Sequence, residues 1–143
     1  MFVQYLAIDD FRPKSTDTRS VAGGDYLSPT WDLVEQGIRT LNDDNRALVV
    51  IANQEDFLDD GGCSLGIGGG TTDGKYLCIA SLNGEESWLS DPSKERGSTR
   101  DIMFGQSMDV DERYCVELAA ILIAAKRFFE DGSLAPELHW IKH

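Results

Sequence analysis

The sequence predicts an α+β domain in which a mainly antiparallel sheet of about five or six strands packs against two main helices. Two segments place apolar residues at spacings of three and four, which is the period of an amphipathic helix. Shorter runs rich in β-branched and aromatic residues alternate with glycine- and asparagine-rich turns, as strands do. No Pro- or Ser-rich linker and no internal repeat interrupts the 143 residues, so residues 1–143 are expected to form one domain.

The first third of the chain predicts a strand, a loop and a helix. Residues 2–8 alternate loosely and suit a strand, whereas residues 9–27 are polar and predict a loop. Ser28 is expected to cap the helix, with Pro29 at its first position, where proline loses no needed donor. The polar residues 42–45 end it. The expected apolar stripe consists of Trp31, Val34, Ile38 and Leu41.

The middle of the chain predicts strands. Ala47–Ala52 is a continuous apolar run of strand length and is expected in the centre of the sheet. An acidic loop follows over residues 53–62. Residues 64–68 and 76–80 flank a glycine-containing turn and predict a hairpin. Two further strands are expected at residues 86–90 and 101–104.

The last helix has the clearest pattern. Asp109 followed by Glu112 resembles a capping box and predicts its start. Asp131-Gly132 predicts its end, and residues 138–141 predict a closing strand. Its expected apolar stripe is Cys115, Leu118, Leu122, Ala125 and Phe129, broadened by Ile121 and Phe128.

The charge balance excludes whole classes of partner. The chain carries 25 Asp and Glu against 13 Lys and Arg, a formal net charge of −12. Nucleic acids and anionic membrane surfaces are therefore not expected partners, because a protein needs clustered Lys and Arg side chains to bind either of them. There is no basic leader and no run of the ~20 apolar residues that a membrane span needs. The three cysteines (Cys63, Cys78 and Cys115) are accordingly expected to be reduced, buried thiols in a cytoplasmic protein.

Two glycine-rich patterns resemble nucleotide-binding loops, but both lack necessary parts. Gly69–Lys75 has phosphate-loop spacing, yet Tyr76 stands where a magnesium-binding hydroxyl is needed, and a strand follows instead of a helix. It is interpreted as a hairpin loop. Gly66–Thr71 lacks the last glycine of a dinucleotide fingerprint, and its glycines favour a bulge or something packed closely on the backbone.

No catalytic residue, cofactor or metal is expected. The only histidines are His139, expected half-exposed on a strand, and His143, expected to be frayed, so neither a triad nor a His-based metal site is supported. The acidic run also lacks the spacing of a calcium loop.

The acidic side chains allow two interpretations, a solvated surface or a surface that steers and holds a basic protein. An aromatic side chain among carboxylates can serve as the anchor of such an interface. The candidate partner-binding residues are Glu55, Asp56, Asp59, Asp60, Glu85, Glu86 and Trp88.

In the C-terminal third, the predicted helix ends in Phe128-Phe129-Glu130-Asp131-Gly132 and leads to Ala135-Pro136-Glu137-Leu138-His139-Trp140. This pattern resembles the type-one immunity-protein family of bacterial polymorphic toxin systems. Ser28-Pro29-Thr30-Trp31 and the hairpin over residues 68–80 are similar to the same family, so the resemblance covers most of residues 28–141. The three residues between Gly132 and Pro136 are a longer connection than the family's pattern has.

The resemblance implies a small cytosolic protein, without catalysis or cofactor, that binds and blocks a cognate toxin, often a deaminase or nuclease. It also implies that Phe129, Gly132, Pro136 and Trp140 are core and turn residues rather than toxin contacts. A toxin that acts on nucleic acid has a basic groove, which an acidic inhibitor complements. A homodimer is left open. The alternatives are a small acidic hydrolase or transferase, which needs a pocket with two carboxylates of shifted pKa, and a structural or regulatory interaction domain.

Overall fold

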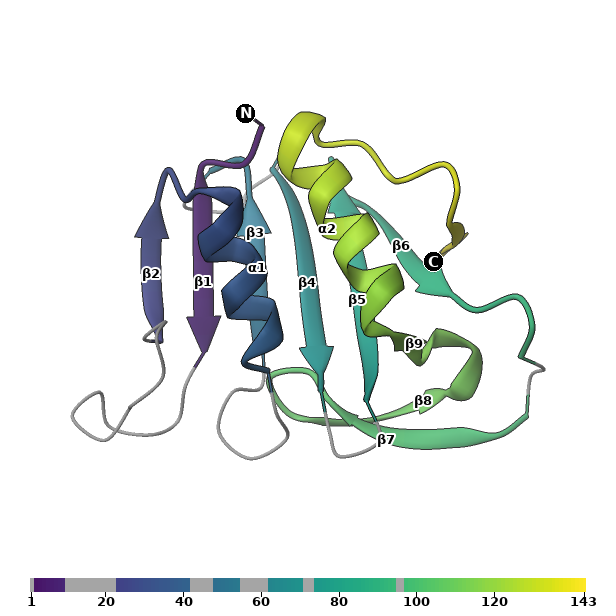
Figure 1. Cartoon of the computed structure of the whole chain (residues 1–143). Coiled ribbons are helices and arrows are strands. Elements are labelled where there is room, and N and C mark those ends of the chain that lie inside the picture. Colours follow the sequence, from purple (N-terminus) through teal and green to yellow (C-terminus); the bar gives the residue numbers. More distant parts are fainter. Residues whose placement is uncertain (1, 10–22, 42–47, 55–61, 71–73, 95–96) are drawn as a thin grey trace.

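The computed structural model describes residues 2–9, 23–41, 48–54, 62–70, 74–94 and 97–143. Over these residues the chain forms an α+β fold with two α-helices and a large antiparallel sheet (Figure 1). In chain order the elements are β1 (Tyr5–Asp9), β2 (Gly24–Leu27), α1 (Trp31–Arg39), β3 (Leu48–Ala52), β4 (Cys63–Gly69), β5 (Lys75–Leu82), β6 (Glu85–Ser90), β7 (Thr99–Met103), β8 (Ser107–Asp111), the 3-10 turn η2 (Glu112–Tyr114), β9 (Val116–Glu117), α2 (Leu118–Asp131) and β10 (His139–Lys142).

The main sheet has eight strands. Seven follow the order β10-β6-β5-β4-β3-β1-β2, and β9 pairs with the start of β5. Strands β7 and β8 form a separate two-stranded hairpin. The expected antiparallel α+β architecture is confirmed, but the expected five or six strands are too few. The strands that sequence reasoning missed are β2, which lies in a predicted loop, and β8 and β9, which lie beside and inside the last predicted helix.

Both helices lie on one face of the sheet (Figure 1) and bury their apolar stripes there. Strand β3 lies inside the sheet between β4 and β1, and its residues 49–52 are buried, as the apolar run Ala47–Ala52 predicted; Ala47 lies outside the described residues. The helix residues with the least exposure are Val34, Gly37 and Ile38 from α1, and Ile121, Ala124, Ala125, Phe128 and Phe129 from α2. The predicted stripe of α1 is therefore confirmed as core-facing, and so is that of α2 except for Cys115, which precedes the helix and is buried in a second cluster with Leu77 and Tyr114.

The start of α1 differs from the prediction. Thr30, not Ser28, is the N-cap, and its side-chain oxygen accepts a hydrogen bond from the Leu33 N–H at 3.2 Å. Ser28 has a positive φ of 49° and donates its backbone N–H to the Gln4 carbonyl at 2.8 Å. Ser28 and Pro29 therefore form the bend that leads from the sheet into the helix.

The start of α2 was also predicted wrongly. Asp109 belongs to β8, opposite Asp101, and α2 begins at Leu118. The residues between them form η2 and β9, which carry Tyr114, Cys115 and Val116 into the core. The capping-box spacing of Asp109 and Glu112 is therefore coincidental, because local pattern cannot show that this segment pairs with distant strands. The predicted end at Gly132 is confirmed, with a left-handed φ of 76°.

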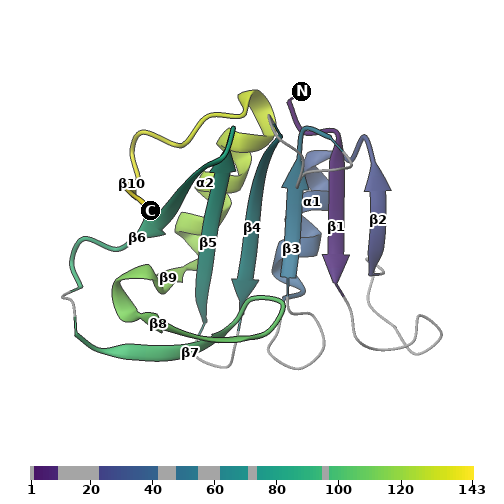
Figure 2. The same cartoon turned by 180° about the vertical axis from the view of Figure 1, so that it is seen from behind.

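The β7–β8 hairpin covers part of the other face of the sheet (Figure 2). Phe104 lies directly against the strand positions of Gly66 and Gly68. A Cβ atom added at Gly68 would lie 2.3 Å from the Met103 carbonyl oxygen, and one added at Gly66 would lie 2.8 Å from the Phe104 ring. The glycines thus allow close packing on the backbone, as their pattern predicted.

The residues that carry the family resemblance lie in the core or in the connection between α2 and β10. Phe129 is buried, and its ring lies 5.7 Å from that of Trp31, which joins two segments about one hundred residues apart. Trp140 donates its indole N–H to the Ala135 carbonyl at 3.2 Å and so holds the connection between α2 and β10. Phe129, Gly132 and Trp140 are confirmed as core or turn residues, and exposed Pro136 lies in a turn that the Leu138 N–H closes by donating to the Ala135 carbonyl at 3.1 Å.

Candidate partner-binding surfaces

The predicted site residues Glu85 and Glu86 begin β6 and are exposed. Glu85 accepts from the Lys142 ammonium at 3.2 Å, and both side chains are about three-quarters exposed (71% and 75%). Such an exposed pair contributes little stability and opens readily. Glu86 accepts from the Trp88 indole N–H at 2.6 Å. Both carboxylates are thus accessible to a partner protein, although each already contacts a side chain of this chain.

Trp88 is half-buried in an aromatic cluster. Its ring stacks on His143 with centroids 4.5 Å apart and meets the Tyr114 ring edge-on at 5.0 Å. His143 is therefore not frayed as expected: its backbone N–H also donates to the Glu86 carbonyl at 2.9 Å. Only part of the Trp88 side chain remains open to a partner.

The other four predicted residues, Glu55, Asp56, Asp59 and Asp60, lie outside the described residues. The flanks of their segment are described. The Asn53 N–H donates to the Cys63 carbonyl at 3.1 Å, and the Asn83 N–H donates to the Gly62 carbonyl at 3.3 Å. Antiparallel pairing thus brings both flanks of the acidic segment to the end of the sheet where β5 turns into β6.

The β7–β8 hairpin carries an acidic surface that sequence reasoning missed. Ile102 and Val110 point toward the sheet and are buried, so the alternate residues face outward. Asp101 and Asp109 are directly opposite each other across the strands and exposed, with Asp111 next along the same face. Neither Asp101 nor Asp109 has an ion-pair or hydrogen-bond partner among the described residues. The alternation Ser107–Asp111 was the available signal, but it was interpreted as a helix start.

Like charges directly opposite each other destabilise a hairpin. We expect Asp109→Lys to raise the free energy of unfolding by about 0.5 kcal/mol, because it replaces this repulsion with an attraction to Asp101. Urea unfolding at low and high salt measures the change, and the gain should shrink as salt screens the pair. Asp109→Asn is the matched control, with roughly half the gain. A loss of stability in both variants would contradict the placement of these two side chains.

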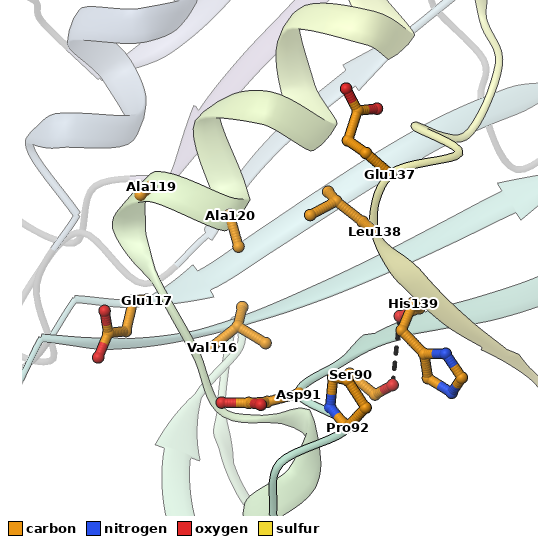
Figure 3. A pocket seen from close by; sticks show the side chains of 10 residues that line it. All are labelled: Ser90, Asp91, Pro92, Val116, Glu117, Ala119, Ala120, Glu137, Leu138 and His139. Atoms are coloured by element: carbon orange, nitrogen blue, oxygen red, sulfur yellow. Dashed lines mark hydrogen bonds between the residues drawn. The ribbon is translucent and has the colours of Figure 1, made fainter.

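The end of β6 and the start of α2 border an open groove of about 530 Å³ (Figure 3). Its floor is apolar, and carboxylates stand around its rim. The residues that line it are Ser90, Asp91, Pro92, Val116, Glu117, Ala119, Ala120, Glu137, Leu138 and His139.

Three side chains of the groove, Ser90, Asp91 and His139, are of types that occur in hydrolytic sites. The Ser90 hydroxyl donates to the backbone carbonyl of His139 at 3.2 Å rather than to its imidazole, so serine and histidine form no nucleophile–base pair here. Hydrogen bonds from the Ser93 hydroxyl and backbone N–H lower the pKa of Asp91, the opposite of what a general acid needs.

The cysteines are structural. All three are free and buried, as predicted. Burial raises the pKa of the Cys78 and Cys115 thiols, which disfavours the reactive thiolate.

Among the described residues, no group of three or more His, Cys, Asp and Glu side chains is placed to hold a metal ion. None of the helices in the described ranges is long and apolar enough to cross a membrane.

Comparisons with models of known protein families and with curated proteins give no match.

Proposed function

We propose that this chain is a cytoplasmic immunity protein that binds and neutralises a cognate bacterial toxin domain, one that acts on nucleic acid such as a deaminase or nuclease. The observation that carries the proposal is the exposed Asp101–Asp109 pair on the hairpin. In the isolated chain these carboxylates repel each other, and a basic partner would relieve that repulsion.

The motif resemblance supports the same proposal. Trp31, Phe129, Gly132 and Trp140 have core or turn positions, so the acidic surfaces elsewhere are free to contact a partner. A net charge of −12 would attract the basic nucleic-acid-binding groove of a toxin over long range. The acidic surface of this chain would then occupy the path that the phosphates take through the groove.

Co-expression with the toxin encoded immediately upstream tests the proposal directly. We expect the wild-type chain to restore growth and to co-purify with the toxin domain. A toxin that remains fully active beside well-folded wild-type protein would exclude the proposed function.

Charge reversal then locates the interface. We expect Glu85→Lys/Glu86→Lys or Asp101→Lys/Asp109→Lys to slow association with the toxin about tenfold at low salt and to weaken its salt dependence. Stopped-flow association at several salt concentrations measures both. Asp25→Lys is the control, because exposed Asp25 lies on β2, at the edge of the sheet opposite β6 and β10. If charge reversal on one of these surfaces changes the association rate no more than Asp25→Lys does, that surface is not part of the interface.

A further inference from the structure

The groove beside α2 combines an apolar floor with an acidic rim. Val116 is 3% exposed, and Ala119, Ala120 and Leu138 complete the apolar lining between the first turn of α2 and the segment before β10 (Figure 3). The rim carries three carboxylates, Asp91, Glu117 and Glu137. No Lys or Arg lines the groove among the described residues.

The three carboxylates differ in how far they are engaged. Asp91 accepts hydrogen bonds from Ser93, and Glu117 pairs with Lys75 at 3.4 Å while remaining 75% exposed. Glu137 is exposed and has no hydrogen-bond or ion-pair partner within the described ranges. Glu137 is therefore the carboxylate best able to receive a new cation.

A second, neighbouring hollow continues the surface along α2. It also uses Glu137, and it includes Ile123, which is 43% exposed. Two cations line this hollow as well, but each has its own carboxylate: Lys126 pairs with Glu130 at 3.8 Å and Arg127 with Asp131 at 3.2 Å. The groove and this hollow thus form a surface with apolar area on both sides of an unpaired carboxylate.

We propose that the groove binds a lysine or arginine side chain from a basic segment of the partner protein. The aliphatic stem of such a side chain covers the apolar floor, and its charged head reaches the rim carboxylates. A second copy of this chain is a poorer occupant, because two bodies of net charge −12 repel each other. The inference rests on the proposed function for the identity of the partner, but the groove can be tested without the toxin.

The probe is a blocked pentapeptide with arginine, leucine and arginine between two glycines, and its counterpart carries glutamate in place of arginine. We expect the arginine peptide to shift the amide resonances of Val116, Ala119, Ala120, Leu138 and His139, with a dissociation constant on the order of 1 mM. The glutamate peptide should leave them unchanged. Equal shifts with both peptides, or none with either at several times that concentration, would overturn the proposal.

Two variants test the contacts. Glu137→Gln should weaken binding of the arginine peptide about threefold at low salt, because it removes one exposed charge. Ala119→Arg should weaken it at least tenfold, because it places the chain's own guanidinium in the groove at an exposed position of α2. Asp25→Asn is the matched control and should bind as wild type. Unchanged binding by both groove variants, with urea midpoints equal to wild type, would exclude the groove.

The same variants separate this inference from the proposed function. If wild type neutralises the toxin but the arginine peptide does not bind the groove, the inference fails and the proposed function stands. If the peptide binds as expected but no toxin is neutralised, the groove remains a site for basic side chains and the proposed function fails.

Discussion

Gly68→Ala is expected to lower the free energy of unfolding by about 3 kcal/mol. The new methyl group would lie 2.3 Å from the Met103 carbonyl oxygen and 2.9 Å from the Phe104 Cα, and these are backbone atoms that cannot move without displacing the β7–β8 hairpin. Urea unfolding measures the loss. Exchange of the hairpin amides shows whether the hairpin separates from the sheet before the rest unfolds.

Gly37→Ala is the matched control for this substitution. A Cβ at Gly37 meets Ile8 side-chain atoms alone, the nearest being its terminal methyl at 2.9 Å, and that methyl lies at the end of a flexible side chain. Alanine also improves helix propensity by up to about 1 kcal/mol, so we expect a small net change. Equal losses at Gly37 and Gly68 would show that the hairpin does not set the cost at Gly68.

Phe128→Ala is expected to cost about 3–5 kcal/mol of unfolding free energy. Phe128 is fully buried between α2 and the sheet, and its ring meets that of Phe2 edge-on at 5.4 Å. Because domains are stable by only about 5–15 kcal/mol, this one truncation should leave a substantial unfolded fraction at 37 °C. Thermal and urea unfolding measure the loss.

Ile123→Ala supplies the comparison on the same helix. Ile123 is 43% exposed, so its truncation leaves no cavity, and we expect a change within about 0.5 kcal/mol. A comparable loss at both positions would mean that α2 presents a different face to the sheet.

The packing of the β7–β8 hairpin on the sheet links stability to partner binding. The glycines of β4 allow the hairpin to pack on the sheet, and the hairpin in turn presents Asp101 and Asp109 to solvent. Gly68→Ala should therefore weaken partner binding at the hairpin even in the folded fraction, whereas Gly37→Ala should leave it unchanged.

Local pattern was sufficient where neighbours in sequence decide the structure. The 3.6-residue stripes of α1 and α2, the left-handed Gly132 that ends α2, and the β4–β5 hairpin were all predictable, since each depends on residues within one or two turns. The two ends of the rejected phosphate loop belong to that hairpin, with the Gly70 N–H donating to the Lys75 carbonyl at 3.0 Å, while residues 71–73 between them lie outside the described residues.

Local pattern failed where distant segments compete for the same residues. Residues 107–117 have a helical capping signal, yet β8 pairs with β7 and β9 pairs with β5. Ser28 has the chemistry of a cap, but its positive φ and its backbone hydrogen bond to Gln4 place it in the bend before α1, so Thr30 is the cap. His143 was expected to be frayed, but Trp88 and Tyr114 from other elements hold it.

The sequence alone therefore determined the fold class, the two helical faces, the buried free thiols and the acidic character of the surface, because composition and short-range periodicity encode them. The tertiary structure decided where the charges are displayed. Strand pairing placed Asp101 opposite Asp109, and the return of the chain at β10 set Glu137 across a groove from Glu117. Such placements depend on backbone hydrogen bonds between residues far apart in the chain, and these bonds are the same for every side chain, so no spacing in the sequence records them.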